Sequence, residues 1–196
     1  MASAEGCCPV SAAKAAYASA KEHGGCEDTA KAAYVNAMAE TAYANALLAQ
    51  GDVEQAATLH QRALATREGA FGPEYIDIAE NLNALATIYR ARGAMTDAES
   101  SYHRALSIIG KVRGPDHPEV AASLYNLAGH YADQGRVLDA EPLYQRAVAI
   151  REKVFGPDAP IVASTLQAYA ALLQAAGRTD AAARIEARAA AITGDQ

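Results

Sequence analysis

The chain repeats itself every 42 residues, and this period restricts the fold more than any other feature. Glycine-proline pairs begin at positions 72, 114 and 156, and the same offset aligns several columns of identical residues. These columns are Ala44, Ala86, Ala128 and Ala170; Gly51, Gly93, Gly135 and Gly177; Ala56, Ala98, Ala140 and Ala182; and Arg62-Ala63, Arg104-Ala105, Arg146-Ala147 and Arg188-Ala189. They predict four tandem units over about 30–71, 72–113, 114–155 and 156–196.

Each unit is predicted to form two helices. In the third unit, apolar residues recur every three or four positions, first at Val120, Leu124, Leu127, Ala128 and Tyr131 and then at Ala140, Tyr144, Ala147 and Val148. This is the spacing of residues on one face of a helix. Gly135 is expected to end the first helix by adopting a left-handed conformation. Pro142 falls in the early turns of the second helix, where fewer hydrogen bonds are lost.

These units resemble the tetratricopeptide repeat family, in particular the 42-residue variety of kinesin light chains. The segments that carry the resemblance are Leu124-Tyr125-Asn126-Leu127-Ala128, Gln134-Gly135-Arg136, 139–147 and Gly156-Pro157-Asp158. The resemblance implies an all-α, right-handed superhelical solenoid of antiparallel helix pairs. It assigns residues 29–196 to four tandem repeats whose first helices line a concave groove.

Residues 1–28 do not follow the repeat. We expect a tail over 1–10 and a short helix over 12–23, capped by Ser11 and ended by Gly24-Gly25. This helix is predicted to cap the array by packing against Tyr34 and Met38. A frayed alanine-rich tail is the alternative.

The first repeat helix is predicted to begin near Asp28 or Thr29 and to end at about Gln50. Its apolar pattern differs from that of its counterparts. Asn36 and Glu40 stand in columns that hold isoleucine, valine or leucine in the other units. We therefore expect this helix to be out of phase with the others, since terminal repeats are commonly atypical.

The resemblance also implies which side chains face the groove. They are Thr41, Asn45 and Leu48 in the first unit, Asn83, Thr87 and Arg90 in the second, Tyr125, Asn126, Gly129 and Asp133 in the third, and Gln167, Ala171 and Gln174 in the fourth. The candidate partner-binding residues among them are Asn45, Asn83, Thr87, Arg90, Tyr125, Asn126 and Gln167. Only Arg90 among these side chains is basic, so the groove suits an extended or helical segment held by amide hydrogen bonds. A solvated surface without a ligand is the alternative.

Charge and motifs exclude several function classes. The net charge of −6 argues against a general nucleic-acid binder, which needs a basic face. Glycine loops for nucleotides, a Gly-x-Ser-x-Gly elbow and a His-Glu-x-x-His motif are absent from the sequence. We therefore expect neither an enzyme nor a cofactor. No apolar run reaches the roughly 20 residues of a membrane span. No signal peptide is visible in the first ten residues, so the expected location is cytoplasmic.

All three cysteines lie near the start of the chain. Cys7, Cys8 and Cys26, together with His23, offer ligands that suit Zn(II) or Cu(I). A helix over 12–23 would be about 18 Å long and would separate Cys8 from Cys26. An internal metal site, a bridge between chains and inert thiols are therefore all open.

The sequence thus predicts a scaffold or adaptor that binds a peptide or protein segment in its groove. One alternative is a structural oligomer that assembles through the ends of the array. Another is a metal- or redox-responsive adaptor that uses the N-terminal cysteines.

Overall fold

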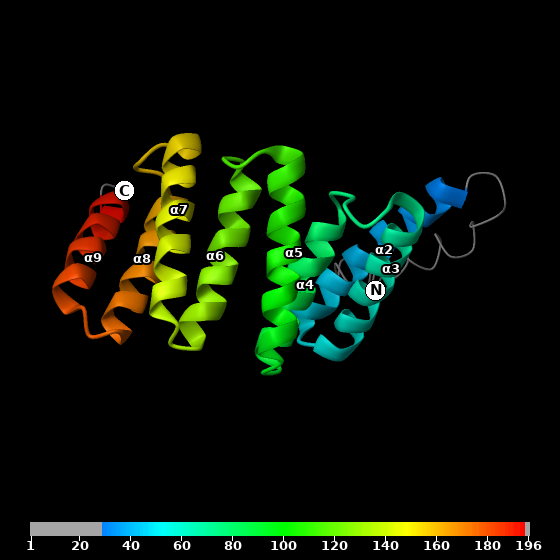
Figure 1. The fold of residues 1–196 in the computed structure, drawn as a ribbon, viewed down its shortest axis with the longest axis horizontal. Helices are drawn as coiled ribbons and strands as arrows, with labels where there is room; N and C mark the ends of the chain where they lie inside the picture. Colours follow the sequence, from blue (N-terminus) through cyan, green and yellow to red (C-terminus); the bar gives the residue numbers. More distant parts are fainter. Residues whose placement is uncertain (1–28, 195–196) are drawn as a thin grey trace, which may run out of the picture. The chain divides into compact units, whose positions relative to one another are not determined.

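The described part of the protein, residues 29–194 of a computed structural model, is entirely helical (Figure 1). No strand occurs within it. None of its helices combines the length and the apolar character needed to cross a bilayer. The helices are α2 (Thr29–Gln50), α3 (Val53–Phe71), α4 (Ile78–Ala91), α5 (Met95–Arg113), α6 (Pro118–Asp133), α7 (Val137–Phe155), α8 (Pro160–Ala175) and α9 (Thr179–Gly194). These helices give each 42-residue unit two helices, as the sequence predicts.

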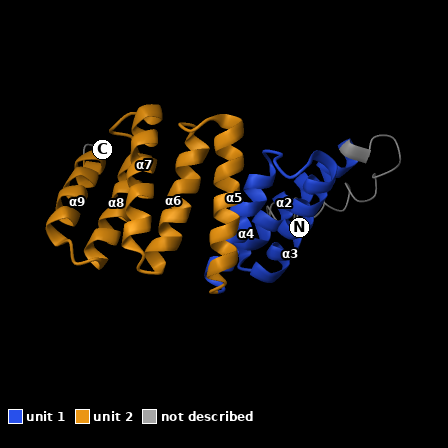
Figure 2. Cartoon of the chain, in the orientation of Figure 1, with its two compact units in different colours: residues 1–92 blue, residues 93–196 orange. Residues whose placement is uncertain are grey.

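The chain divides into two compact units, which are described separately (Figure 2). Unit 1 ends at Arg92 and unit 2 begins at Gly93, so the boundary falls between the two helices of the second repeat. In unit 1, α3 packs against both α2 and α4. In unit 2, each helix from α5 to α9 packs against the next, and α6 also touches α8. Within unit 2, the first helices α6 and α8 of successive repeats are thus neighbours.

Local sequence signals set the helix ends. The Asp52 side chain accepts a hydrogen bond from the backbone nitrogen of Gln55 and caps α3. Gly135 has a φ of 69°, the left-handed conformation predicted for it. There the backbone nitrogen of Arg136 donates to the carbonyl of Tyr131 at 2.9 Å, which closes the end of α6. The left-handed conformation of Gly135 therefore ends α6 and lets the chain turn toward α7.

The alanine columns lie where paired helices cross. Ala44 and Ala56 are fully buried and pack together with Leu47 and Leu59 between α2 and α3. Methyl side chains at these positions let the two helix backbones approach closely. The predicted core positions of α6 and α7 are all buried, and Leu127 is only 1% exposed.

One prediction about α2 is wrong. Glu40, expected to lie out of phase, occupies its core column and is only 5% exposed. The helix keeps the register because Arg62 of α3 places a guanidinium nitrogen 2.9 Å from the Glu40 carboxylate. An ion pair therefore replaces the aliphatic contact made by Leu82 and its counterparts.

The predicted contact partners of the N-terminal helix are only partly covered. Tyr34 packs edge-on against Phe71, with ring centroids 6.1 Å apart. Met38 is 48% exposed. The predicted helix over 12–23 lies outside the described residues.

Candidate functional site

In unit 2, α6 and α8 present a row of small and amide side chains with one carboxylate, Asp133. We call this row the first-helix face of unit 2. Its exposed or half-buried members are Ala122, Asn126, Gly129 and Asp133 of α6, and Ser164, Gln167, Ala171 and Gln174 of α8. Because most of these side chains are short, the backbone of a bound segment can come close to the helices. Asn126 is half-buried and Gln167 is exposed.

Tyr125 is held by internal contacts as well as facing outward. Its ring meets the buried Tyr144 ring edge-on at 5.8 Å, and the guanidinium of Arg151 lies over it at 5.0 Å. Arg151 is itself buried. Tyr125 therefore contributes to packing between α6 and α7, and only part of it is available to a ligand.

In unit 1, a corresponding first-helix face runs along α2 and α4. Asn45 of α2 donates a hydrogen bond to the Glu80 carboxylate of α4 at 3.2 Å, which ties the two exposed surfaces together. Thr87 is exposed and donates to the carbonyl of Asn83 within α4 at 3.0 Å. Arg90 is half-buried on the same helix.

The seven candidate residues are divided between the units. Four lie on α2 and α4 in unit 1, and three lie on α6 and α8 in unit 2. Thr41, which the resemblance also assigned to the groove, is buried with 3% exposure. Its hydroxyl takes part in a buried hydrogen-bond network.

The buried network of unit 1 consists of Thr41, His60, Arg67 and Asn81. Arg67 is 2% exposed and donates to the Thr41 hydroxyl and to the carbonyl of Asp77, each at 3.1 Å. It also donates to the Asn81 side-chain oxygen. The Asn81 amide donates to Thr41 at 3.0 Å and to His60 Nδ1 at 3.2 Å. The network joins α2, α3 and α4 through neutral acceptors around one buried cation.

The same device recurs 84 residues later, in unit 2. Arg151 donates to the Thr165 hydroxyl and to the carbonyl of Ile161. The ring of Tyr125 takes the place that Thr41 has under Arg67. In the intervening repeat, the arginine column holds Ile109, which is buried. Arginine recurs in this column at Arg67 and Arg151, each time with a polar residue 14 positions later, and that recurrence is the signal that could have revealed both networks.

His60 gives unit 1 a titratable group in its core. Burial lowers the pKa of His60 to about 4, and the nearby charge of Arg67 acts in the same direction. Because Nδ1 accepts from Asn81, the proton of the neutral ring is on Nε2. That nitrogen has no hydrogen-bond partner among the described residues.

We expect acid to destabilise unit 1 through His60. The folded pKa is below the value of about 6.5 in an unfolded chain, so the unfolded state binds more protons as the pH falls. The free energy of unfolding should drop by about 1.5 kcal/mol between pH 6.5 and pH 5. Denaturant melts of the wild type and of His60→Gln would measure it. The raised pKa of Glu40, due to burial and opposed by Arg62, is present in both proteins, so their difference isolates His60. Identical pH profiles would contradict the prediction.

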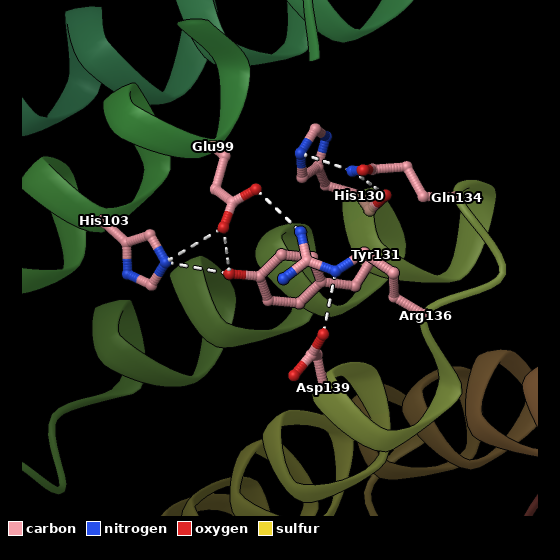
Figure 3. A network of polar contacts seen from close by, with 7 residues as sticks. All are labelled: Glu99, His103, His130, Tyr131, Gln134, Arg136 and Asp139. Atoms are coloured by element: carbon pink, nitrogen blue, oxygen red, sulfur yellow. Dashed lines mark hydrogen bonds and ion pairs between the residues drawn. The ribbon is translucent and has the colours of Figure 1, made fainter. Parts of the chain in front are cut away.

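In unit 2, a second polar network joins α5, α6 and the start of α7 (Figure 3). The Tyr131 hydroxyl donates to Glu99 at 2.8 Å, and Arg136 donates to the other oxygen of that carboxylate at 2.8 Å. His103 Nε2 lies 2.9 Å from the Tyr131 oxygen, and Asp139 accepts from Arg136. Arg136 also lies over the Tyr131 ring at 4.2 Å. The network therefore links the second helix of the second repeat to the two helices of the third repeat.

The charges of this network reinforce one another. Burial acts to raise the pKa of Glu99, but hydrogen bonds from Tyr131 and Arg136 outweigh it and lower the pKa. Burial and the hydrogen bond to Glu99 raise the pKa of Tyr131 to about 12. The same scheme recurs one repeat later, where Glu141 accepts from Tyr169 and Arg178. Its repetition between successive repeats identifies it as a structural element.

In the part of the chain that the structure describes, no group of three or more histidine, cysteine, aspartate or glutamate side chains is arranged to hold a metal ion. The predicted candidates Cys7, Cys8, His23 and Cys26 lie outside the described residues.

Comparison with known proteins gives the same fold. A crystal structure of BtubC (BKLC) from P. vanneervenii is 24% identical, with a TM-score of 0.83, over 94% of this chain and 72% of the other. A putative kinesin light chain from Podospora anserina with TPR-like repeats is 23% identical, with a TM-score of 0.75, over 95% of this chain and 86% of the other. A substituted variant of the latter gives a TM-score of 0.77 at 23% identity, over 95% and 85% of the two chains. No curated protein sequence matches significantly.

The family follows from sequence as well as from fold. The family model described as tetratricopeptide repeat matches residues 34–99, 77–132 and 119–193, which together span most of the chain. This agrees with the helix pairs, the 42-residue period and the solenoid structures that the chain resembles. The chain belongs to the tetratricopeptide repeat family.

Proposed function

We propose that this protein is an interaction scaffold that binds a segment of a partner protein on the exposed faces of its first helices. Tetratricopeptide repeats generally mediate protein–protein interactions, and proteins of the family are generally not enzymes. The ligand is an extended or helical protein segment, and recognition relies on amide side chains and close backbone contact.

The observation that carries the proposal is the composition of the first-helix face of unit 2. Asn126 and Gln167 supply donors and acceptors that pair with a peptide backbone. The neighbouring positions Ala122, Ser164 and Ala171 are small and exposed. Short neighbours leave room for a chain to reach the amides, whereas long charged side chains would hold it away.

The first helices of unit 1 offer similar chemistry on a face of their own. Exposed Val35 and Met38 on α2 lie on the same helix as the exposed amide of Asn45. Arg90 of α4 adds a positive charge that would favour an acidic residue in the ligand. A partner segment with a few apolar side chains and little net charge fits these features best.

Loss of either amide should weaken binding. After a partner has been captured from the native host, calorimetry should show that Asn126→Ala and Gln167→Ala each reduce affinity by about 1–3 kcal/mol, or roughly 5- to 150-fold. Neither side chain is in the core, so the melting temperature should be unchanged.

Arg184→Ala is the control, because Arg184 is exposed on α9, which is a second helix. Its affinity should equal that of the wild type. If Asn126→Ala and Gln167→Ala bind as tightly as Arg184→Ala, the partner does not use this face. Tyr125→Ala is less informative, since its contacts with Tyr144 and Arg151 would also affect stability.

A further inference from the structure

One side of α2 is less buried than the same side of every other first helix in the described chain. The residues concerned are Asn36, Ala39, Tyr43 and Ala46, all half-buried. Their counterparts are all buried, namely Ile78, Asn81, Leu85 and Ile88 on α4; Val120, Ser123, Leu127 and His130 on α6; and Val162, Thr165, Tyr169 and Leu172 on α8. We call the four residues of α2 the leading face.

In the other first helices, the preceding second helix covers this side. Asn81 of α4 meets His60 and Arg67 of α3. His130 of α6 lies 5.8 Å from the Tyr102 ring of α5. In each case the covering helix comes immediately before the covered one in the chain. By the same geometry, the occupant of the leading face of α2 would be a helix that directly precedes residue 29.

We propose that residues 12–23 dock on the leading face of α2 and take the place of a second helix. The proposal commits to this segment of the chain, which lies outside the described residues, as the occupant. It follows from the burial pattern and does not depend on the proposed function.

The spacing along the chain supports this occupant. Helix α3 ends at Phe71 and α4 begins at Ile78, while four residues separate α5 from α6 and α7 from α8. Residues 24–28 provide a connection of similar length between the segment and α2. Like the other three connections, this one begins with glycine.

The side chains on both surfaces are also compatible. On a helix, Ala12, Ala13, Ala16 and Ala20 would share one side, with Tyr17 at its edge. The leading face is equally free of charge and includes Ala39 and Ala46. Short side chains on both partners allow close approach of the two backbones.

A second copy of the chain is a less suitable occupant. In such an assembly, α9 of the copy would provide the covering helix. Its residue in the column of His60, Tyr102 and Tyr144 is Glu186. Docking would bring this carboxylate against the uncharged leading face, and burying an unpaired charge is costly.

Hydrogen exchange of the full chain tests the proposal with matched substitutions. Ala39→Glu places a carboxylate on the leading face, whereas Ala42→Glu makes the same change three residues later, at an exposed position of α2. In the wild type and in Ala42→Glu, amides of 12–23 should exchange at least about tenfold more slowly than in an unstructured peptide. In Ala39→Glu this protection should be lost, while α6 to α9 stay protected.

A second pair of substitutions keeps the test informative if Ala39→Glu fails to fold. Ala46→Glu lies on the leading face and Ala49→Glu on the exposed side, and they should behave as Ala39→Glu and Ala42→Glu do. Equal protection of 12–23 in all variants, or none in the wild type, would overturn the proposal. So would light scattering showing a wild-type dimer that Ala39→Glu converts to a monomer, because the occupant would then be a second copy.

Discussion

Replacing Leu127 with alanine is expected to lower the free energy of unfolding by about 2–5 kcal/mol. Leu127 is 1% exposed on α6 and shares its column with the half-buried Tyr43 and the buried Leu85 and Tyr169. Removing three buried carbon atoms loses their transfer free energy and leaves a cavity that the packed helices cannot fill completely. Urea denaturation followed by circular dichroism would measure the change.

Leu138→Ala is the matched control. Leu138 is the second residue of α7 and is 86% exposed, so the same substitution should change the free energy of unfolding by less than about 0.5 kcal/mol. Equal effects at the two positions would mean that the helical register of α6 is wrong.

Replacing Arg67 with isoleucine is expected to cost about 3–5 kcal/mol, because the buried acceptors Thr41, Asn81 and the carbonyl of Asp77 would each lose a donor. The chain contains its own control for this change. One repeat later, the arginine and asparagine columns hold Ile109 and Ser123, both buried.

Combining Arg67→Ile with Asn81→Ser copies that natural pair into unit 1. Asn81→Ser removes the orphaned side-chain oxygen of Asn81, but it also removes the amide that donates to Thr41 and His60. These effects oppose each other, so the double variant should lie within about 1 kcal/mol of Arg67→Ile alone. Denaturant melts of the wild type, both single variants and the double variant give the coupling energy. A loss below about 1 kcal/mol in Arg67→Ile would show that the network adds little to stability.

The helices could be predicted because the same local residue signals recur in each of the four units. The glycine column predicts where first helices end, and Gly135 has the left-handed φ expected of it. The alanine columns predict where paired helices cross, and Ala44 and Ala56 are buried there. Each inference drew on four copies of the same local chemistry.

The buried polar groups could not be predicted in the same way. A polar residue in a helix is normally taken as exposed. Glu40 breaks the apolar pattern of its column, whereas Arg67 stands in a column that also holds Arg151 and Thr193. Their burial depends on partners from other helices: Glu40 pairs with Arg62, and Arg67 reaches Thr41 and Asn81. Such pairings need the three-dimensional arrangement, because the partners are 14 to 26 residues away from Arg67 in the chain.

The candidate binding residues could be assigned only as surface positions. The family resemblance assigned Asn45, Thr87 and Gln167 to helix surfaces, where they are exposed. It gave no means of separating Tyr125, whose ring packs on Tyr144 and under Arg151, from its more exposed neighbours. The identity of the ligand also depends on the shape and chemistry of the partner. This sequence determines only one of the two binding surfaces.

Site-specific photo-crosslinking in the native host tests most directly whether first helices form the binding surface. A photoreactive residue would replace Ala122 on α6 or Ala149 on α7, both exposed in unit 2. The proposed function predicts that a partner protein is crosslinked from position 122 and not from position 149. Crosslinking from position 149 alone would place the partner on the second helices and contradict it.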